Sequence, residues 1–144
     1  MSKDATDNVK VRHVGITDNL SSELLYEIRK TEELTKNNCG TTLNIALNYG
    51  GRSEITNAIQ KFSNSIKVGE FNIKDINEDI FDNYLFTAGL SDVDLIIRTS
   101  EECRISNFLL WQSAKAKIWT TSILWPDFKE ENLWEAISYY SSEE

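Results

Sequence analysis

The segment Asp92–Gln112 constrains the fold more than any other, because it predicts a strand, a loop and a helix in direct succession. Its strand would contain Val93, Leu95, Ile96 and Ile97, a short apolar set rich in β-branched residues, which is typical of a parallel strand buried on both faces. Ser106 or Asn107 is suited to cap a helix that would carry the apolar residues 108–111. This order of elements predicts an α/β domain in which the loop lies at the carboxyl end of a strand.

The loop between this strand and helix carries two arginines and a serine, Arg98, Arg104 and Ser106. The first N–H groups of a helix attract anions, and the positive end of the helix dipole adds to this attraction. The guanidinium groups of Arg98 and Arg104 can add bidentate hydrogen bonds to a phosphate. We therefore expect an anion site in this loop. In the alternative interpretation, both arginines are structural ion-pair partners of a nearby carboxylate, that of Asp94, Glu101 or Glu102.

Strand and helix patterns alternate along the rest of the chain. Alternation with a period of two predicts strands, and apolar residues at intervals of three and four predict helices. The expected strands are 9–14, Thr41–Asn48, 93–97 and Ala116–Thr121, and the other expected helices are Ser21–Lys36, a helix capped by Ser53, a short helix after a capping box of Asp75 with Glu78, and Glu130–Tyr140. This alternation predicts a mostly parallel sheet flanked by helices.

The carboxyl ends of parallel strands share one edge of a sheet. Asn48 ends the second expected strand and Arg52 follows it, on either side of two adjacent glycines that permit close backbone approach. We therefore expect Asn48 and Arg52 to converge on the same crevice as Arg98, Arg104 and Ser106. The alternative for the glycine pair is an ordinary tight turn between a strand and a helix.

The chain has 144 residues, of which 40% are hydrophobic and 26% charged, so it is long enough and apolar enough to bury one core. We expect a flexible N-terminus over 1–8, a single α/β domain over 9–141 and a tail over 142–144. The four tryptophans all lie within 111–134, where we expect them to pack in the core or at a subunit interface.

Charge and cysteine content argue against several classes of partner and location. The net charge is −8, from 15 basic and 23 acidic residues, so the chain as a whole lacks the positive surface that nucleic acid or an anionic membrane requires. Cys39 and Cys103 are isolated, which suggests a reducing compartment. The polar start has none of the apolar character of a signal peptide or membrane span. We expect a cytoplasmic protein.

Four blocks of the chain are similar, in the same order, to the cis-prenyltransferases, the undecaprenyl diphosphate synthase family: Leu43–Arg52, Asp94–Ser100, Arg104–Gln112 and Leu124–Phe128. The resemblance covers nearly the whole chain from Val9 onward and corresponds to the C-terminal portion of the family's usual length. It implies an α/β domain that dimerises, in which Arg98, Arg104 and Ser106 hold the diphosphate of isopentenyl diphosphate. The family condenses this substrate with an allylic diphosphate, assisted by Mg²⁺, to make polyprenyl diphosphates.

The sequence departs from the family pattern at positions that matter for this chemistry. We expect no counterpart for the family's N-terminal Asp-Gly-Asn-Gly-Arg-Trp segment, which supplies the catalytic aspartate, or for its C-terminal Arg-x-Gly segment. Glu101 replaces a glycine beside the expected diphosphate site. Lys117 replaces a metal-ligating glutamate, and its ammonium cannot ligate Mg²⁺ but could pair with phosphate. We therefore do not expect this chain alone to hold Mg²⁺.

The resemblance thus predicts the isopentenyl-diphosphate-binding half of a prenyltransferase, inactive by itself and working as a homodimer or with a complementary N-terminal chain. One alternative is a non-catalytic diphosphate-binding or regulatory partner of an intact synthase, and another is a decayed gene product that keeps only the fold. No catalytic residue is expected in this chain. The candidate substrate-binding residues are Arg98, Arg104 and Ser106, with Asn48, Arg52 and Lys117 as secondary candidates.

Overall fold

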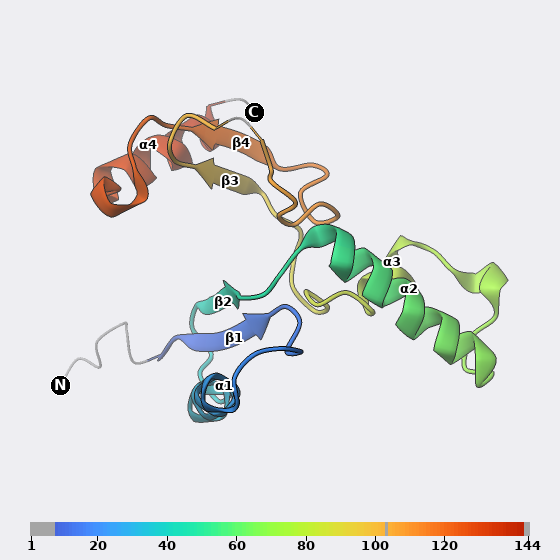
Figure 1. Ribbon diagram of the computed structural model, residues 1–144. Coiled ribbons are helices and arrows are strands. Elements are labelled where there is room, and N and C mark those ends of the chain that lie inside the picture. The colour runs from blue at the N-terminus through green and yellow to red at the C-terminus, as the bar shows by residue number, and fades with distance from the viewer. Residues whose placement is uncertain (1–7, 103, 143–144) are drawn as a thin grey trace. The chain divides into compact units, whose positions relative to one another are not determined.

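A computed structural model describes residues 8–102 and 104–142 of the chain (Figure 1). The structure divides into two compact units, the first ending at Ala88 and the second beginning at Gly89, and each contains one pair of parallel strands. The predicted α/β class with parallel strands and helices is confirmed. The single domain expected over 9–141 stays a prediction. Most of the expected N-terminal and C-terminal tails, and Cys103, lie outside the described residues.

The first unit begins with a strand, a helix and a second strand. β1 (Lys10–Val14) and β2 (Thr42–Ala46) are parallel neighbours, and α1 (Ser22–Thr35) connects them (Figure 1). Parallel strands require a long crossover of this kind. The Ser21 hydroxyl accepts a hydrogen bond of 3.2 Å from the Leu24 N–H and so caps α1. All three elements agree with the sequence predictions to within two residues at each end.

The first unit continues with α2 (Gly51–Lys67), the 3₁₀ turn η2 (Ile73–Asp75) and α3 (Glu78–Asp82). Two predicted caps are wrong. α2 begins after Gly50, and the Ser53 hydroxyl donates to the Gly50 carbonyl oxygen (2.8 Å) from inside the first turn. Asn77 caps α3 through its side-chain oxygen, while Asp75 forms a capping box of η2 with Asn72. Several polar residues precede α3, and spacing alone does not select among them, whereas α2 begins before Ser53 without a side-chain cap.

The core of the first unit consists mainly of α2 and the segment around α3. Its buried apolar residues are Val14, Ala58, Phe62, Phe81 and Leu85. The Phe62 ring meets Tyr84 edge to face, with centroids 5.3 Å apart, a favoured arrangement of aromatic rings. Ile59 follows Ala58 in α2 and is apolar too, but it is 51% exposed. The buried stripe of α2 is therefore narrower than the apolar pattern predicts.

The second unit contains β3 (Leu95–Arg98), β4 (Lys117–Thr120), the 3₁₀ turn η3 (Trp125–Asp127) and α4 (Glu130–Ser141). The strands run parallel, with Leu95 opposite Lys117 and Arg98 opposite Thr120. Ala136 of α4 is fully buried. The predicted strands and the final helix are confirmed, and this register decides which end of the strand pair each candidate residue occupies.

The helix expected to begin at Ser106 or Asn107 does not form, and 104–116 is a series of turns between β3 and β4. Ser106 (φ 52°), Asn107 (φ 62°) and Leu109 (φ 47°) adopt left-handed backbone conformations, through which a right-handed helix cannot continue. The apolar residues 108–111 are also consecutive, so they define no single helical face. An anion site in this loop must therefore rely on side chains and not on a helix dipole.

Two of the four tryptophans lie outside the core, because Trp125 is 73% exposed and Trp134 is 59% exposed. Trp125 stacks on Phe128, with ring centroids 5.9 Å apart. The expectation of core packing is wrong for these two rings, while a role at an interface stays a prediction. No helix among the described residues is long and apolar enough to cross a membrane.

Candidate functional site

The second unit brings three of the predicted site residues together around one carboxylate, that of Glu102. Arg98, the last residue of β3, donates from Nη2 to Glu102 Oε2 (2.6 Å) and to Ser106 Oγ (3.1 Å). Arg104 donates from Nε to Glu102 Oε2 (3.0 Å) and from Nη2 to Glu102 Oε1 (2.9 Å). We call Arg98, Glu102, Arg104 and Ser106 the arginine cluster. The proposed alternative of an ion pair is thus present, and Glu102 is the partner.

The backbone after β3 is held to the backbone after β4. The Glu101 N–H donates to the Thr121 carbonyl oxygen (2.8 Å), and the Ser100 N–H donates to the Ile123 carbonyl oxygen (3.2 Å). Ser100 (φ 67°) and Glu101 (φ 56°) both adopt left-handed conformations, in which the chain turns sharply. The chain reverses direction at this turn, and Glu102 therefore lies beside Arg98.

The arginine cluster shifts the titration of its carboxylate. Hydrogen bonds from Arg104, then those from Arg98, lower the pKa of Glu102 below its ordinary value of 4.5. The side chains of Arg104 and Glu102 are 74% and 39% exposed, whereas that of Arg98 is 26% exposed. Glu102 is therefore a carboxylate near neutral pH, and the cluster contains two positive charges and one negative charge.

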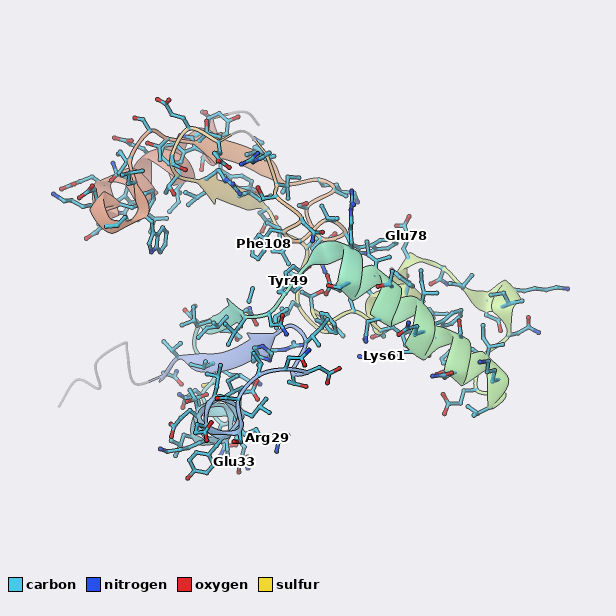
Figure 2. The ribbon with its side chains drawn as sticks, in the orientation of Figure 1. Arg29, Glu33, Tyr49, Lys61, Glu78 and Phe108 are labelled. Atoms are coloured by element: carbon cyan, nitrogen blue, oxygen red, sulfur yellow. The ribbon has the colours of Figure 1, made fainter. Side chains whose placement is uncertain are left out.

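An apolar cavity of about 200 Å³ adjoins the arginine cluster within the second unit. Its lining residues are Val93, Leu95, Ile96, Ile97, Arg98, Arg104, Ile105, Phe108, Leu109 and Ile118, of which Phe108 is labelled in Figure 2. Apart from the two arginines, these side chains are hydrocarbon or aromatic. A cavity with apolar walls and a few converging polar groups is the usual form of a small-molecule site.

Lys117 lies at the opposite end of the strand pair from Arg98. It begins β4 opposite Leu95, whereas Arg98 ends β3 opposite Thr120, an offset of about 10 Å along the strands. The Lys117 ammonium donates to the Tyr140 carbonyl oxygen (2.9 Å) and lies 5.2 Å from the centroid of the Tyr140 ring. This geometry supports a structural role that joins β4 to α4, and contact with a phosphate stays a prediction.

The other two secondary candidates, Asn48 and Arg52, belong to the first unit. Asn48 has a φ of 52°, and its side-chain amide donates to the carbonyl oxygens of Ile16 (3.0 Å) and Asp18 (3.1 Å). It thus ties the turn after β2 to the turn after β1. Arg52 is an exposed residue in the first turn of α2. Their convergence with the arginine cluster stays a prediction.

A buried carboxylate in the first unit was not predicted. Glu54 is only 1% exposed, and it accepts hydrogen bonds from the Tyr49 hydroxyl (2.5 Å) and from the Thr87 N–H (3.3 Å) and hydroxyl (3.4 Å). Tyr49, labelled in Figure 2, directly precedes Gly50, the N-cap residue of α2. The sequence contained a sign of this burial, because Glu54 shares one face of α2 with Ala58 and Phe62, at intervals of four residues. These bonds connect the start of α2, next to Gly50 and Gly51, to the residues Tyr49 and Thr87.

The described residues show no cluster of side chains suited to a metal ion. They contain no group of three or more His, Cys, Asp or Glu side chains placed to hold a metal ion. Mg²⁺ prefers oxygen ligands, and Lys117, which the resemblance places at a metal-ligating position, carries an ammonium group. The donors that the arginine cluster offers to an anion are guanidinium and hydroxyl groups.

Comparisons with known proteins agree with the fold and identify the family. A family described as "putative undecaprenyl diphosphate synthase" matches residues 1–144. The chain is 50% identical over 139 residues to an isoprenyl transferase of Streptococcus pneumoniae, covering 94% of this chain and 55% of that protein. It is 44% identical over 138 residues to the (2E,6E)-farnesyl-diphosphate-specific ditrans,polycis-undecaprenyl-diphosphate synthase of Vibrio vulnificus, covering 96% of this chain and 55% of that protein.

Solved structures show the same likeness. The crystal structure of lavandulyl diphosphate synthase from Lavandula x intermedia, in complex with dimethylallyl diphosphate, matches with a TM-score of 0.92 and 31% identity, over 96% of this chain and 59% of that one. The crystal structure of a probable undecaprenyl diphosphate synthase from Campylobacter jejuni matches with a TM-score of 0.82 and 30% identity, over 99% of this chain and 64% of that one. The chain spans about half the length of the curated relatives it matches. It belongs to the undecaprenyl diphosphate synthase family of prenyltransferases.

Proposed function

We propose that this chain binds the diphosphate group of an isoprenoid substrate, isopentenyl diphosphate in the first place, as part of a prenyl-transfer reaction. The observation that carries the proposal is the pair Arg98 and Arg104 beside an apolar cavity. Guanidinium groups match the oxygens of a phosphate in geometry and charge. The apolar walls suit the hydrocarbon part of the same ligand. One ligand that satisfies both features is an isoprenoid diphosphate.

The names of similar proteins support this class of ligand. The Vibrio vulnificus relative is named for farnesyl diphosphate, and the lavender enzyme was crystallised with dimethylallyl diphosphate. Both compounds join a diphosphate to an apolar chain, as isopentenyl diphosphate does. Because this chain spans about half of its relatives' length, the complete transfer reaction is also part of the proposal.

In the proposed complex, Arg98 and Arg104 bind and orient the diphosphate, and the Ser106 hydroxyl donates a further hydrogen bond. The hydrocarbon group enters the cavity, whose apolar residues exclude water from it. Mg²⁺ assists the transfer reaction in the family, but the donors named here are groups of the chain itself. We therefore propose that binding of the diphosphate to this chain depends little on Mg²⁺.

Calorimetry with isopentenyl diphosphate and with inorganic pyrophosphate tests the proposed site. Arg104→Ala removes one charge-assisted contact, so the affinity should fall roughly tenfold, and Arg98→Ala should act in the same direction. Arg29→Ala is the matched control, because Arg29 is an exposed arginine of α1, labelled in Figure 2. The titrations are repeated with and without Mg²⁺. Unchanged affinity in both cluster variants would mean that these arginines serve only as ion-pair partners of Glu102.

We further propose that this chain alone does not extend an allylic diphosphate. Departure of a diphosphate requires positioned stabilisation of its charge, and Lys117 stands where the family has a metal-ligating glutamate. Incubation with labelled isopentenyl diphosphate, farnesyl diphosphate and Mg²⁺ should therefore give no longer product. Robust turnover would contradict this part of the proposal and leave the binding proposal in place.

Association with a second copy of the chain is the third part of the proposal. β1 and β2 form a two-stranded sheet, and Leu43 and Ile45 of β2 are 51% and 48% exposed. Parallel strands are normally covered on both faces. A complementary chain with an N-terminal segment of the family is the other partner that such a surface would suit.

A further inference from the structure

We infer that the Glu102 carboxylate occupies the diphosphate site when no ligand is bound, and that a diphosphate must displace this carboxylate from Arg98 and Arg104 in order to bind. The inference rests on the proposed function, and it adds a competing group that sets how tightly the site binds its ligand. Glu102 uses the Nε and Nη2 groups of Arg104, the edge of the guanidinium that binds a phosphate bidentately. It also takes Nη2 of Arg98.

The charges argue for displacement and against coexistence. A diphosphate that bound to both arginines with Glu102 in place would bring its own negative charges next to that carboxylate. Like charges at such short range repel, and the repulsion remains substantial near a protein surface. Glu102 and the ligand therefore compete for the same donors.

The position of Glu102 makes its release easy. Glu102 lies in the loop after β3, outside any helix or strand, and its side chain is 39% exposed. A change of side-chain rotamer can therefore carry the carboxylate into water without unfolding a regular element. Ion pairs at exposed positions are weak, whereas a diphosphate offers more charge and more oxygens to the same two guanidinium groups.

Glu102→Ala should therefore bind inorganic pyrophosphate about threefold to tenfold more tightly than the wild-type chain does, because the competing ion pairs are gone. Glu102→Gln keeps the size of the side chain, removes its charge and should change the affinity in the same direction. Glu101→Ala is the matched control, since it removes an equal charge from the adjacent residue. Its effect should be clearly smaller.

The measurement is calorimetry with inorganic pyrophosphate, together with nuclear magnetic resonance of the Arg104 Nε–H group. Pyrophosphate should move this resonance in the wild-type chain, and Glu102→Gln without ligand should move it as well. Equal or weaker pyrophosphate binding by both Glu102 variants would overturn the inference. If Arg104→Ala still weakened binding, the proposed function would stand. Absence of pyrophosphate binding in the wild-type chain and in every variant would overturn both.

Discussion

Glu101 adopts a backbone conformation that favours glycine, at a position where the family pattern has glycine. Its φ of 56° lies in the left-handed region, which is costly for a residue with a side chain. The turn is nevertheless maintained, since the Glu101 N–H donates to the Thr121 carbonyl oxygen across the strand pair. Glu101 thus combines backbone strain with a negative charge between Arg98 and Glu102 of the arginine cluster.

Glu101→Gly should stabilise the chain by about 0.5–1 kcal/mol, because relief of the left-handed strain exceeds the extra entropy of glycine in the unfolded state. Urea unfolding measures the difference. Glu101→Ala is the control, since it removes the charge but keeps a Cβ and therefore the strain. An equal gain in both variants would show that charge, and not the backbone, is responsible.

At the scale of elements, α1 depends on its cap because its packing is modest. α1 has no buried residue, and the Ser21 hydroxyl satisfies the Leu24 N–H at its first turn. The turns of 104–116 show the converse case, in which residues suited to cap a helix are present but no helix follows. A cap stabilises a helix that packing already favours and does not create one.

Ser21→Ala should lower the free energy of unfolding by about 1 kcal/mol, the usual loss for an N-terminal cap. Ser22→Ala provides the comparison, because the Ser22 hydroxyl donates to the exposed carboxylate of Glu23 (3.2 Å). Urea unfolding of both variants, followed by circular dichroism, measures the two losses. If Ser22→Ala were as destabilising as Ser21→Ala, the cap would not be the source of the effect.

For the whole molecule, the proposed association predicts a concentration-dependent increase in mass. Sedimentation at micromolar concentration should show dimers or larger species, and Leu43→Lys should shift the population toward monomer by placing a charge on the exposed strand β2. Leu34→Lys, at a 74% exposed position of α1, is the control and should leave the population unchanged. A monomer that binds no hydrophobic dye would contradict the proposed association.

The sequence alone determined the order and type of most elements, because periodicity within a segment reports which of its faces is apolar. It also determined that Arg98, Arg104 and Ser106 lie close together in the chain, at the end of a parallel strand and in the segment that follows it. Residues so near in the chain stay near in any fold, so a local cluster was predictable. For the same reason, Glu102 was one of three nearby carboxylates that the sequence suggested as ion-pair partners of Arg98 and Arg104.

Only the tertiary structure decided the rest. Glu102 and not a neighbouring carboxylate pairs with the arginines because two successive residues before it, Ser100 and Glu101, are left-handed. The contact of Lys117 with Tyr140 depends on the register of β3 and β4 and on the packing of α4, which lies further along the chain. The burial of Glu54 depends on Thr87, a distant residue whose donors make that burial tolerable. Sequence patterns report local preferences, whereas backbone handedness at a turn, register and long-range hydrogen bonds are set by packing between segments.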